Sequence, residues 1–206
     1  MAKVQGVSEK LQGLLYDAFF VPSEPATATF QSAMTDPRVI RFFVDIQNKT
    51  KLETNLQAAG VLPSLNKYEA RALRVIVSNI RFTSTKGESN RNESEVLADL
   101  IYNSVTTLIV GEKVMFEAPT FWFPSGAGVN PGFPRITNHG EPNPMATFRF
   151  AEPVYIEPQQ NFRVEMLFPR GVPGQGSTPD ATMLAGVKGP FHIWVALDGY
   201  LTRDVQ

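Results

Sequence analysis

The stretch that decides the fold runs from Ala146 to Pro169 and reads ATFRFAEPVYIEPQQNFRVEMLFP. In its second half, large apolar residues occupy every second position: Phe162, Val164, Met166 and Phe168. Polar Arg163 and Glu165 lie between them, and Leu167 is the apolar exception. This period of two is typical of a β-strand with one buried face. We therefore predict a long central strand, with Phe42, Val44, Val75 and Ile193 packed near its buried side.

Two prolines limit how the first half of this stretch can fold. Thr147–Phe150 and Val154–Ile156 are candidate strands, and Pro153 and Pro158 interrupt them. Because proline cannot donate to a sheet ladder, each proline is expected at a strand start, an edge or a bend. We predict two short strands separated by a bend, and then a turn at Gln159–Asn161. Such a path suggests a strand that crosses the corner of a sandwich or barrel.

Composition bounds the class of protein and its partners. With 206 residues, of which 43% are hydrophobic, the chain can form one substantial core. The absence of cysteine excludes disulfides, thiolate chemistry and Cys-ligated zinc. A net charge of −1 without a basic block predicts no nucleic-acid partner. No apolar run approaches ~18 residues, and residues 1–20 lack a signal-peptide layout, so no membrane partner is expected.

The N-terminal region has apolar residues at helical spacing: Leu11, Leu14, Leu15 and Phe19. Ser8 can cap such a helix, and Pro22 lies just beyond its end. The spacing predicts a short helix over residues 8–20, followed by extended chain. We therefore divide the chain into an N-terminal arm, residues 1–37, and a β-sandwich domain, residues 38–206.

The body of the chain carries several further strand patterns. They are Val39–Gln47, Tyr68–Phe82, a hairpin of Thr106–Val110 and Val114–Glu117 around Gly111, and Phe191–Leu197 before a turn at Asp198-Gly199. One helix is expected at Asn92–Asn103, where Asn92 and Glu95 have the spacing of a capping box. We predict an all-β fold: an antiparallel sandwich of jelly-roll type with one inserted helix and an N-terminal arm.

The inventory of catalytic residues is small. The chain has only two histidines, His139 and His192, which is too few for a histidine-rich metal site. No serine occupies a Gly-x-Ser-x-Gly turn. A glycosidase needs two carboxyl groups facing each other across a groove. The acids on the predicted strands are isolated: Asp45, Glu117, Glu165 and Asp198. We therefore predict no catalytic residue, no metal ligand, no cofactor and no enzymatic activity.

An aromatic run, Phe121-Trp122-Phe123, stands at the start of a long Gly/Pro-rich loop, Pro119–Pro144, which also contains Phe133. Three interpretations stay open for this run. It can be core at the end of a strand, which is the interpretation we favour. It can be a contact between subunits, because Trp and Phe anchor interfaces. It can also be a platform on which a sugar stacks.

The combination of arm, cysteine-free β-sandwich and long Gly/Pro loops resembles the single jelly-roll structural proteins of viral and bacteriophage capsids. Glu152–Pro169 and Thr54–Pro63 are similar in style to phage head proteins, including small major capsid, cement and decoration proteins. The resemblance implies a non-enzymatic role in forming or reinforcing a capsid shell. It also implies homo-oligomers, a trimer first among them, with other capsid subunits as partners. The location would be the virion, after synthesis in the host cytoplasm.

The residues expected to contact other subunits are the large apolar side chains of the arm and the aromatic residues in or beside the long loop. They are Leu11, Leu14, Leu15, Phe19, Phe20, Phe121, Trp122 and Phe133. Two alternative functions remain: a carbohydrate- or receptor-binding β-sandwich module, and a glycoside-active jelly-roll enzyme. A lectin-like module should expose an aromatic groove, whereas a shell protein should bury its arm against its neighbours.

Overall fold

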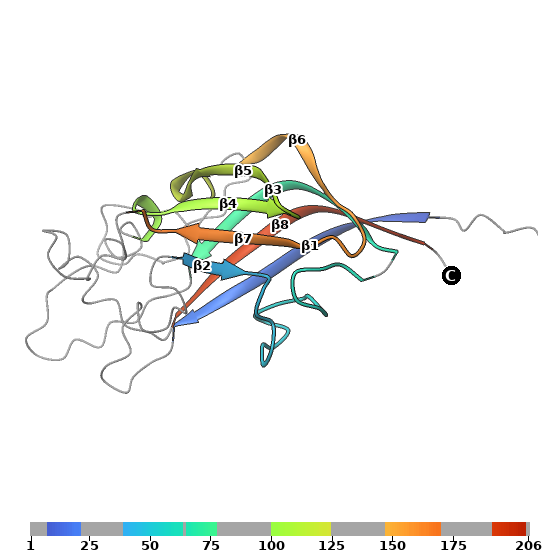
Figure 1. The fold of residues 1–206 in the computed structure, drawn as a ribbon, viewed down its shortest axis with the longest axis horizontal. Coiled ribbons are helices and arrows are strands. Elements are labelled where there is room, and N and C mark those ends of the chain that lie inside the picture. Colours follow the sequence, from blue (N-terminus) through green and yellow to red (C-terminus); the bar gives the residue numbers. More distant parts are fainter. Residues whose placement is uncertain are drawn as a thin grey trace, which may run out of the picture.

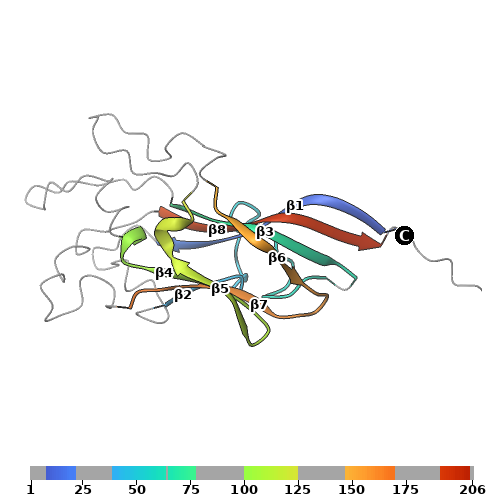
Figure 2. The same ribbon diagram turned by 90° about the horizontal axis from the view of Figure 1, so that it is seen from above.

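The computed structural model describes residues 8–21, 39–63, 65–77, 100–124, 147–169 and 191–204. Eight strands in this part form two antiparallel sheets packed face to face (Figures 1 and 2). The first sheet contains, in spatial order, β1 (Ser8–Val21), β8 (Phe191–Asp204), β3 (Lys67–Val77) and β6 (Arg149–Ile156). The second contains β2 (Val39–Phe42), β7 (Phe162–Leu167), β4 (Val105–Val110) and β5 (Lys113–Pro119). The predicted antiparallel all-β sandwich is confirmed.

The strands pair in a nested order along the chain. β1 pairs with β8, β2 with β7, β3 with β6, and β4 with β5. The β3–β8 and β4–β7 pairings then join these ribbons into the two sheets. The β4–β5 hairpin turns at Gly111, whose φ of 60° suits glycine, as predicted. The chain is thus arranged like one long hairpin whose two arms run side by side through both sheets.

The central strand β7 has the predicted register. Its alternate side chains Phe162, Val164 and Met166 are almost completely buried, and so is Phe168, just beyond its end. Phe42, Val75 and Ile193 are buried in the same core, as predicted, but Val44 is exposed. The strand expected over Val39–Gln47 ends at Phe42, and Phe43 has a φ of 69°. This turn breaks the alternation, so Phe43 enters the core in place of Val44.

Residues 8–21 form a strand, so the helix predicted over residues 8–20 is wrong. All 14 residues of β1 pair with β8, from Ser8 opposite Asp204 to Val21 opposite Phe191. The apolar spacing fits both periods, because Leu11, Leu15 and Phe19 are four apart and therefore also share one face of a strand. Pairing with β8 decides between the two. This part of the predicted arm therefore belongs to the first sheet, and residues 1–7 and 22–38 lie outside the described residues.

The proline-containing stretch forms one strand where two were predicted. β6 runs through Pro153, which is possible because β6 is the edge of the first sheet. The predicted turn follows, where Gln159 has a φ of 59° and the Gln160 N–H donates to the Glu157 carbonyl at 3.1 Å. Since β6 and β7 belong to different sheets, the chain crosses a corner of the sandwich here.

The inserted helix is described only at its end. Residues 100–102 are helical, and Leu100 and Ile101 are buried, as their place in the predicted apolar stripe requires. The rest of Asn92–Asn103 lies outside the described residues, as do residues 78–82 of the strand predicted over Tyr68–Phe82.

The turn predicted at Asp198-Gly199 is wrong, because β8 continues to Asp204. Gly199 instead permits a close approach of two strands. A Cβ atom at Gly199 would lie 1.9 Å from the Glu69 carbonyl oxygen, beside a register shift between Ala70 and Ala72 in β3. The glycine is therefore required by the sheet itself.

Gly199→Ala is expected to lower the free energy of unfolding by about 1–3 kcal/mol, because the added methyl group must displace the backbone of β3. Gly13→Ala is the matched control, since a Cβ there would meet no atom closer than 3.4 Å. Chemical denaturation of the two variants checks this. If both variants lose the same free energy of unfolding, the close approach of Gly199 to the Glu69 main chain is contradicted.

Candidate interaction surfaces

Three exposed aromatic side chains gather beside the end of β5: Tyr102, Phe121 and Trp122. We call them the aromatic surface. The rings of Tyr102 and Phe121 are 5.6 Å apart between centroids and inclined by 28°, and those of Phe121 and Trp122 are 6.0 Å apart and inclined by 29°. Phe121 and Trp122 belong to a short 3-10 helix, η2 (Thr120–Trp122), which follows β5 directly.

The aromatic surface stands on a firmly held base. The Thr120 side chain is buried and lies within hydrogen-bond distance of the hydroxyls of Ser104 (2.7 Å) and Thr106 (2.8 Å). Phe123, the next residue of the aromatic run, is completely buried and packs edge-on against Phe148. The run is therefore divided: its last ring is core, and its first two rings face outward. The exposed rings are thus presented with little freedom to fold back into the core.

The contact candidates of the predicted arm differ in their environment. Leu11, Leu14 and Phe20 are exposed on β1, while Phe19 is partly buried against the core. Leu15 is buried in the core of its own chain, so it is not available for a contact between subunits. Phe133 lies outside the described residues.

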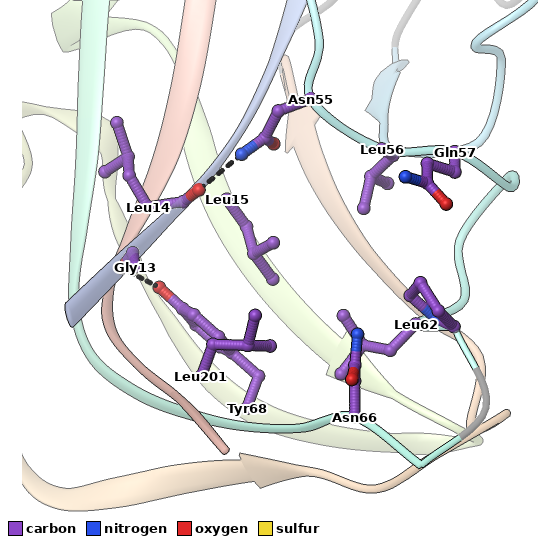
Figure 3. Close-up of a pocket in the computed structure, with 11 residues that line it drawn as sticks. Gly13, Leu14, Leu15, Asn55, Leu56, Gln57, Leu62, Asn66, Tyr68 and Leu201 are labelled. Carbon is purple, nitrogen blue, oxygen red and sulfur yellow. Dashed lines mark hydrogen bonds between the residues drawn. The ribbon is translucent and has the colours of Figure 1, made fainter. Parts of the chain in front are cut away.

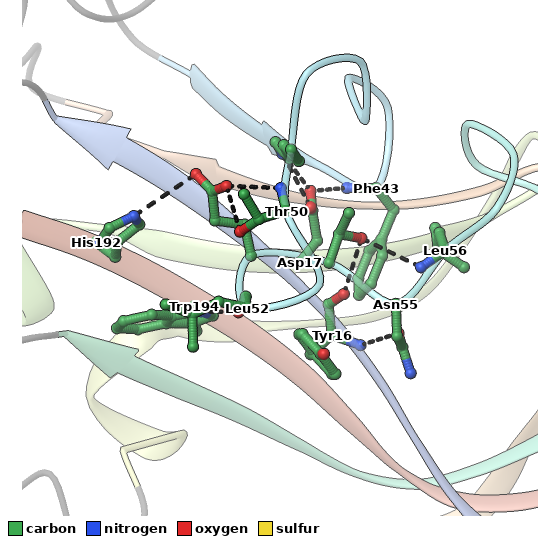
Figure 4. A network of polar contacts seen from close by, with 12 residues as sticks. Tyr16, Asp17, Phe43, Thr50, Leu52, Asn55, Leu56, His192 and Trp194 are labelled. Carbon is green, nitrogen blue, oxygen red and sulfur yellow. Dashed lines mark hydrogen bonds and ion pairs between the residues drawn. The ribbon is translucent and has the colours of Figure 1, made fainter.

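The segment after β2 covers the outer edge of β1 near Leu14 and Tyr16 (Figure 4). The Asn55 side chain accepts a hydrogen bond from the Tyr16 N–H at 3.0 Å and donates one to the Leu14 carbonyl at 2.5 Å. The Asn55 main-chain N–H and the Thr54 hydroxyl both donate to the Tyr16 carbonyl. Asn55 thus takes the place that the main chain of an additional strand would occupy.

Beneath this cover lies a buried ion pair that the sequence did not reveal. The Asp17 carboxylate is completely buried, and both of its oxygens lie 2.9 Å from Lys49 Nζ. The Phe43 N–H donates to the same carboxylate at 2.6 Å. Burial raises the pKa of Asp17, and the bonds from Lys49 and Phe43 oppose that rise. The ion pair therefore ties β1 to the segment that follows β2.

His192 lies in a second link between the same segment and the first sheet. Its Nε2 is 3.6 Å from the Glu53 carboxylate, and its ring stacks 4.9 Å from that of Trp194. The N–H of Thr50 donates to Glu53 at 2.8 Å and is the main reason why the pKa of Glu53 lies below its usual range. His192 therefore has a structural partner in Glu53. His139 lies outside the described residues.

The strand carboxylates are bound to partners of their own. Glu165 accepts a hydrogen bond from Arg163 at 2.8 Å, and Asp198 pairs with Arg74 at 2.5 Å. Glu117 accepts one from the Thr107 hydroxyl at 3.2 Å. Within the described ranges, no three His, Cys, Asp or Glu residues form a group that could hold a metal ion.

A cavity of about 290 Å³ lies between β1 and the segment that contributes residues 55–57, 62–63 and 66 (Figure 3). Most of its wall is aliphatic, with Leu15, Leu56, Leu62 and Leu201 among the lining residues. The side chains of Asn55, Gln57 and Asn66 add uncharged amides. Such a lining suits an apolar group without charge.

Comparisons with known proteins return no match: no family model, no curated protein and no solved structure resembles the chain closely enough to count. In the part of the chain that is described, no helix is long and apolar enough to cross a membrane. The function is therefore argued from the strand order and from the surfaces above.

Proposed function

We propose that this chain is a jelly-roll structural protein of a phage or virus particle, which forms or reinforces the shell through contacts with other subunits. The observation that carries the proposal is the nested pairing of eight strands, with sheet orders β1-β8-β3-β6 and β2-β7-β4-β5. This is the order obtained when a long two-stranded ribbon is rolled into two facing sheets. Jelly rolls of this kind recur in viral capsid and lectin domains.

A fold alone does not define a function, so the surfaces must support the choice. The aromatic surface of Tyr102, Phe121 and Trp122 is the feature that does so. Tyr and Trp are enriched among the residues that dominate binding energy at protein interfaces. Here they are exposed, and Trp122 follows the hydrogen-bonded Thr120 in η2, so the main chain of this part of the surface is already ordered before a partner covers it.

The same rings also support the alternative proposal of a carbohydrate- or receptor-binding module, because exposed aromatic faces can stack on sugars. The two roles differ in what the purified protein does alone. A shell protein should associate with copies of itself into a symmetric oligomer, for which a trimer is our first expectation. A lectin-like module should bind glycans without any change in its own association.

Light scattering coupled to size-exclusion chromatography, followed by electron microscopy of the assembled fraction, tests the proposal. We expect a defined symmetric oligomer or shell whose fraction rises with protein concentration. A chain that stays monomeric up to about millimolar concentration, the weak end of specific binding, while it binds an immobilised glycan, would replace the shell role with the lectin-like role.

The Phe121→Ser/Trp122→Ser double variant is expected to weaken self-association by at least about tenfold, because it removes two anchor residues. Its folded stability should change little, since both side chains are exposed. Tyr155→Ser is the control, because Tyr155 is an equally exposed aromatic residue on β6, in the other sheet. Sedimentation velocity and circular dichroism measure the two effects. Equal association of both variants and the wild type would exclude the aromatic surface as the contact.

A further inference from the structure

In the described part of the chain, no strand pairs with the outer edge of the first half of β1. β1 is the outermost strand of the first sheet, and Tyr16 directs both its N–H and its C=O away from β8, toward Asn55. Main-chain groups alternate in direction with a period of two along an antiparallel strand. The N–H and C=O of Gln12 and Lys10 therefore point the same way as those of Tyr16. In the described part of the chain, only β8 pairs with these residues, and it does so from the opposite side.

This edge lies on a part of the molecule that projects. Figures 1 and 2 both show β1 and β8 continuing together past the end of the second sheet. Leu11, on the core-facing side of β1 opposite Leu201, is consequently exposed. Natural proteins usually block such an edge or pair it with another strand. Here Asn55 blocks the edge only as far as Leu14.

The charged residues beside this edge give it little protection by repulsion. Lys10 Nζ lies 2.5 Å from a Glu69 carboxylate oxygen within the same sheet, and Glu9 pairs with Arg203. Each charge near the edge thus has an opposite charge beside it in its own chain, although Glu69 is shared between Lys10 and Arg71. These ion pairs lower the repulsion that an approaching strand meets, but two like charges set directly opposite each other would still repel.

We propose that Glu9–Gly13 pairs antiparallel with the same segment of a second copy, so that two first sheets join into one continuous sheet. Main-chain hydrogen bonding requires Lys10 and Gln12, whose N–H and C=O groups point outward, to face outward-pointing groups of the second copy. The charges on Glu9 and Lys10 then limit which residue can lie on the twofold axis. A register centred on Lys10 would set two lysines opposite each other, and one centred on Glu9 would do the same with two glutamates. The register centred on Leu11 avoids both, because it sets Lys10 opposite Gln12 of the second copy.

In this register the main chains of Lys10 and Gln12 exchange hydrogen bonds across a twofold axis, in two equivalent pairs. The two Leu11 side chains meet on the axis, on the same side of the sheet as the core. The added strand ends where Asn55 begins to cover β1, so the length of the contact is set by the fold. The contact is isologous, as is usual for dimers.

Cysteine cross-linking tests the register. The chain contains no cysteine, so Leu11→Cys introduces a unique thiol. Residue 11 would form a non-hydrogen-bonded pair with Cα atoms about 4.5 Å apart, which lies within the range that a disulfide spans. Leu14→Cys is the control, because Leu14 is exposed to 44% against 39% for Leu11. In the proposed register, residue 14 of the second copy lies about 20 Å away, just beyond the far end of the paired segment.

Mild oxidation should convert the Leu11→Cys protein to a covalent dimer and leave the Leu14→Cys protein monomeric on a denaturing gel. Equal cross-linking of the two variants, or none in either, would overturn the proposal. Opposite charges at residue 11 give a second test. The Leu11→Lys protein and the Leu11→Glu protein should each fail to dimerise alone, and an equimolar mixture of the two should dimerise. If mixing the two variants does not increase dimerisation, a twofold axis at residue 11 is contradicted. The contact follows from the β1 edge alone, so its failure leaves the proposed shell role to its own test.

Discussion

Replacement of Phe162 by alanine is expected to lower the free energy of unfolding by about 3–5 kcal/mol. Phe162 is almost fully buried on β7, and its ring lies 5.2 Å from that of Phe43 between centroids. The Phe162 N–H donates to the Gly60 carbonyl at 2.7 Å, which fixes the backbone on this side. The space left by the ring therefore cannot close easily, and a cavity adds to the lost burial. Urea denaturation with an unchanged m-value measures the loss.

Leu167→Ala is the matched control for this prediction. Leu167 belongs to the same strand but is exposed on the outer face, so its truncation should cost no more than about 0.5–1 kcal/mol. Phe162→Leu should fall between the two, below about 1.5 kcal/mol, because most of the volume is kept. A Phe162→Ala variant as stable as Leu167→Ala would contradict the register of β7.

The alternation that predicted β7 was reliable because the strand has neighbours on both sides. β2 and β4 pair with β7, and one face of the strand is sealed in the core. A register slip by one residue would turn Phe162 and Val164 to solvent. Under these constraints the local pattern and the tertiary environment require the same structure. β8 behaves alike, with Ile193, Val195 and Leu197 fully buried.

β1 shows where a local pattern is insufficient. Leu11, Leu15 and Phe19 satisfy a helix and a strand equally well, and the choice is made by β8, about 180 residues away in the chain. The strand phase also places Asp17 on the core-facing side, between Leu15 and Phe19. An acid at that position requires a partner. Nothing in the sequence indicates that this partner is Lys49, because no regular spacing links the two residues.

The aromatic run shows a related limit. Three interpretations were compatible with Phe121-Trp122-Phe123, and the structure divides the run between two of the environments they describe. Phe123 is core, whereas Phe121 and Trp122 are exposed. The division depends on the short helix η2, which turns neighbouring side chains in different directions. Local sequence patterns likewise could not predict the nested strand order, because that order consists of pairings between strands far apart in the chain.

Lys49→Met is expected to cost about 3–5 kcal/mol at neutral pH, because it leaves the buried Asp17 carboxylate without its cation. Methionine keeps most of the lysine stem, so lost packing contributes little to this figure. The Phe43 N–H still donates to Asp17, but one hydrogen bond does not balance a buried charge. Thermal or urea denaturation of the variant against the wild type measures the cost.

The pH dependence of this cost has a definite sign. Burial raises the pKa of Asp17 in the folded state above its value in the unfolded chain, and removal of Lys49 raises it further. Between the pKa of Asp17 in the unfolded chain and its higher pKa in the folded state, the folded state binds more protons than the unfolded one. The contribution of Asp17 to the free energy of unfolding therefore falls as pH rises. The deficit of Lys49→Met relative to the wild type should therefore be largest at neutral pH. It should shrink as the pH is lowered toward the pKa of an ordinary aspartate. A deficit independent of pH would show that the loss is one of packing.

Asp17→Asn separates the charge from the shape. The asparagine oxygen can still accept the Phe43 N–H, and Lys49, with 17% of its side chain exposed, can turn toward water. We expect the free energy of unfolding of this variant to lie within about 1 kcal/mol of that of the wild type, because replacing a buried charge costs far less than leaving one unpaired.

The double variant Asp17→Asn/Lys49→Met should accordingly recover most of the stability lost in Lys49→Met. The difference between the double variant and the sum of the single ones is the coupling energy of the pair. Additive effects would mean that Asp17 and Lys49 do not interact, and the segment after β2 would then be held to β1 by Asn55 and Thr54 alone.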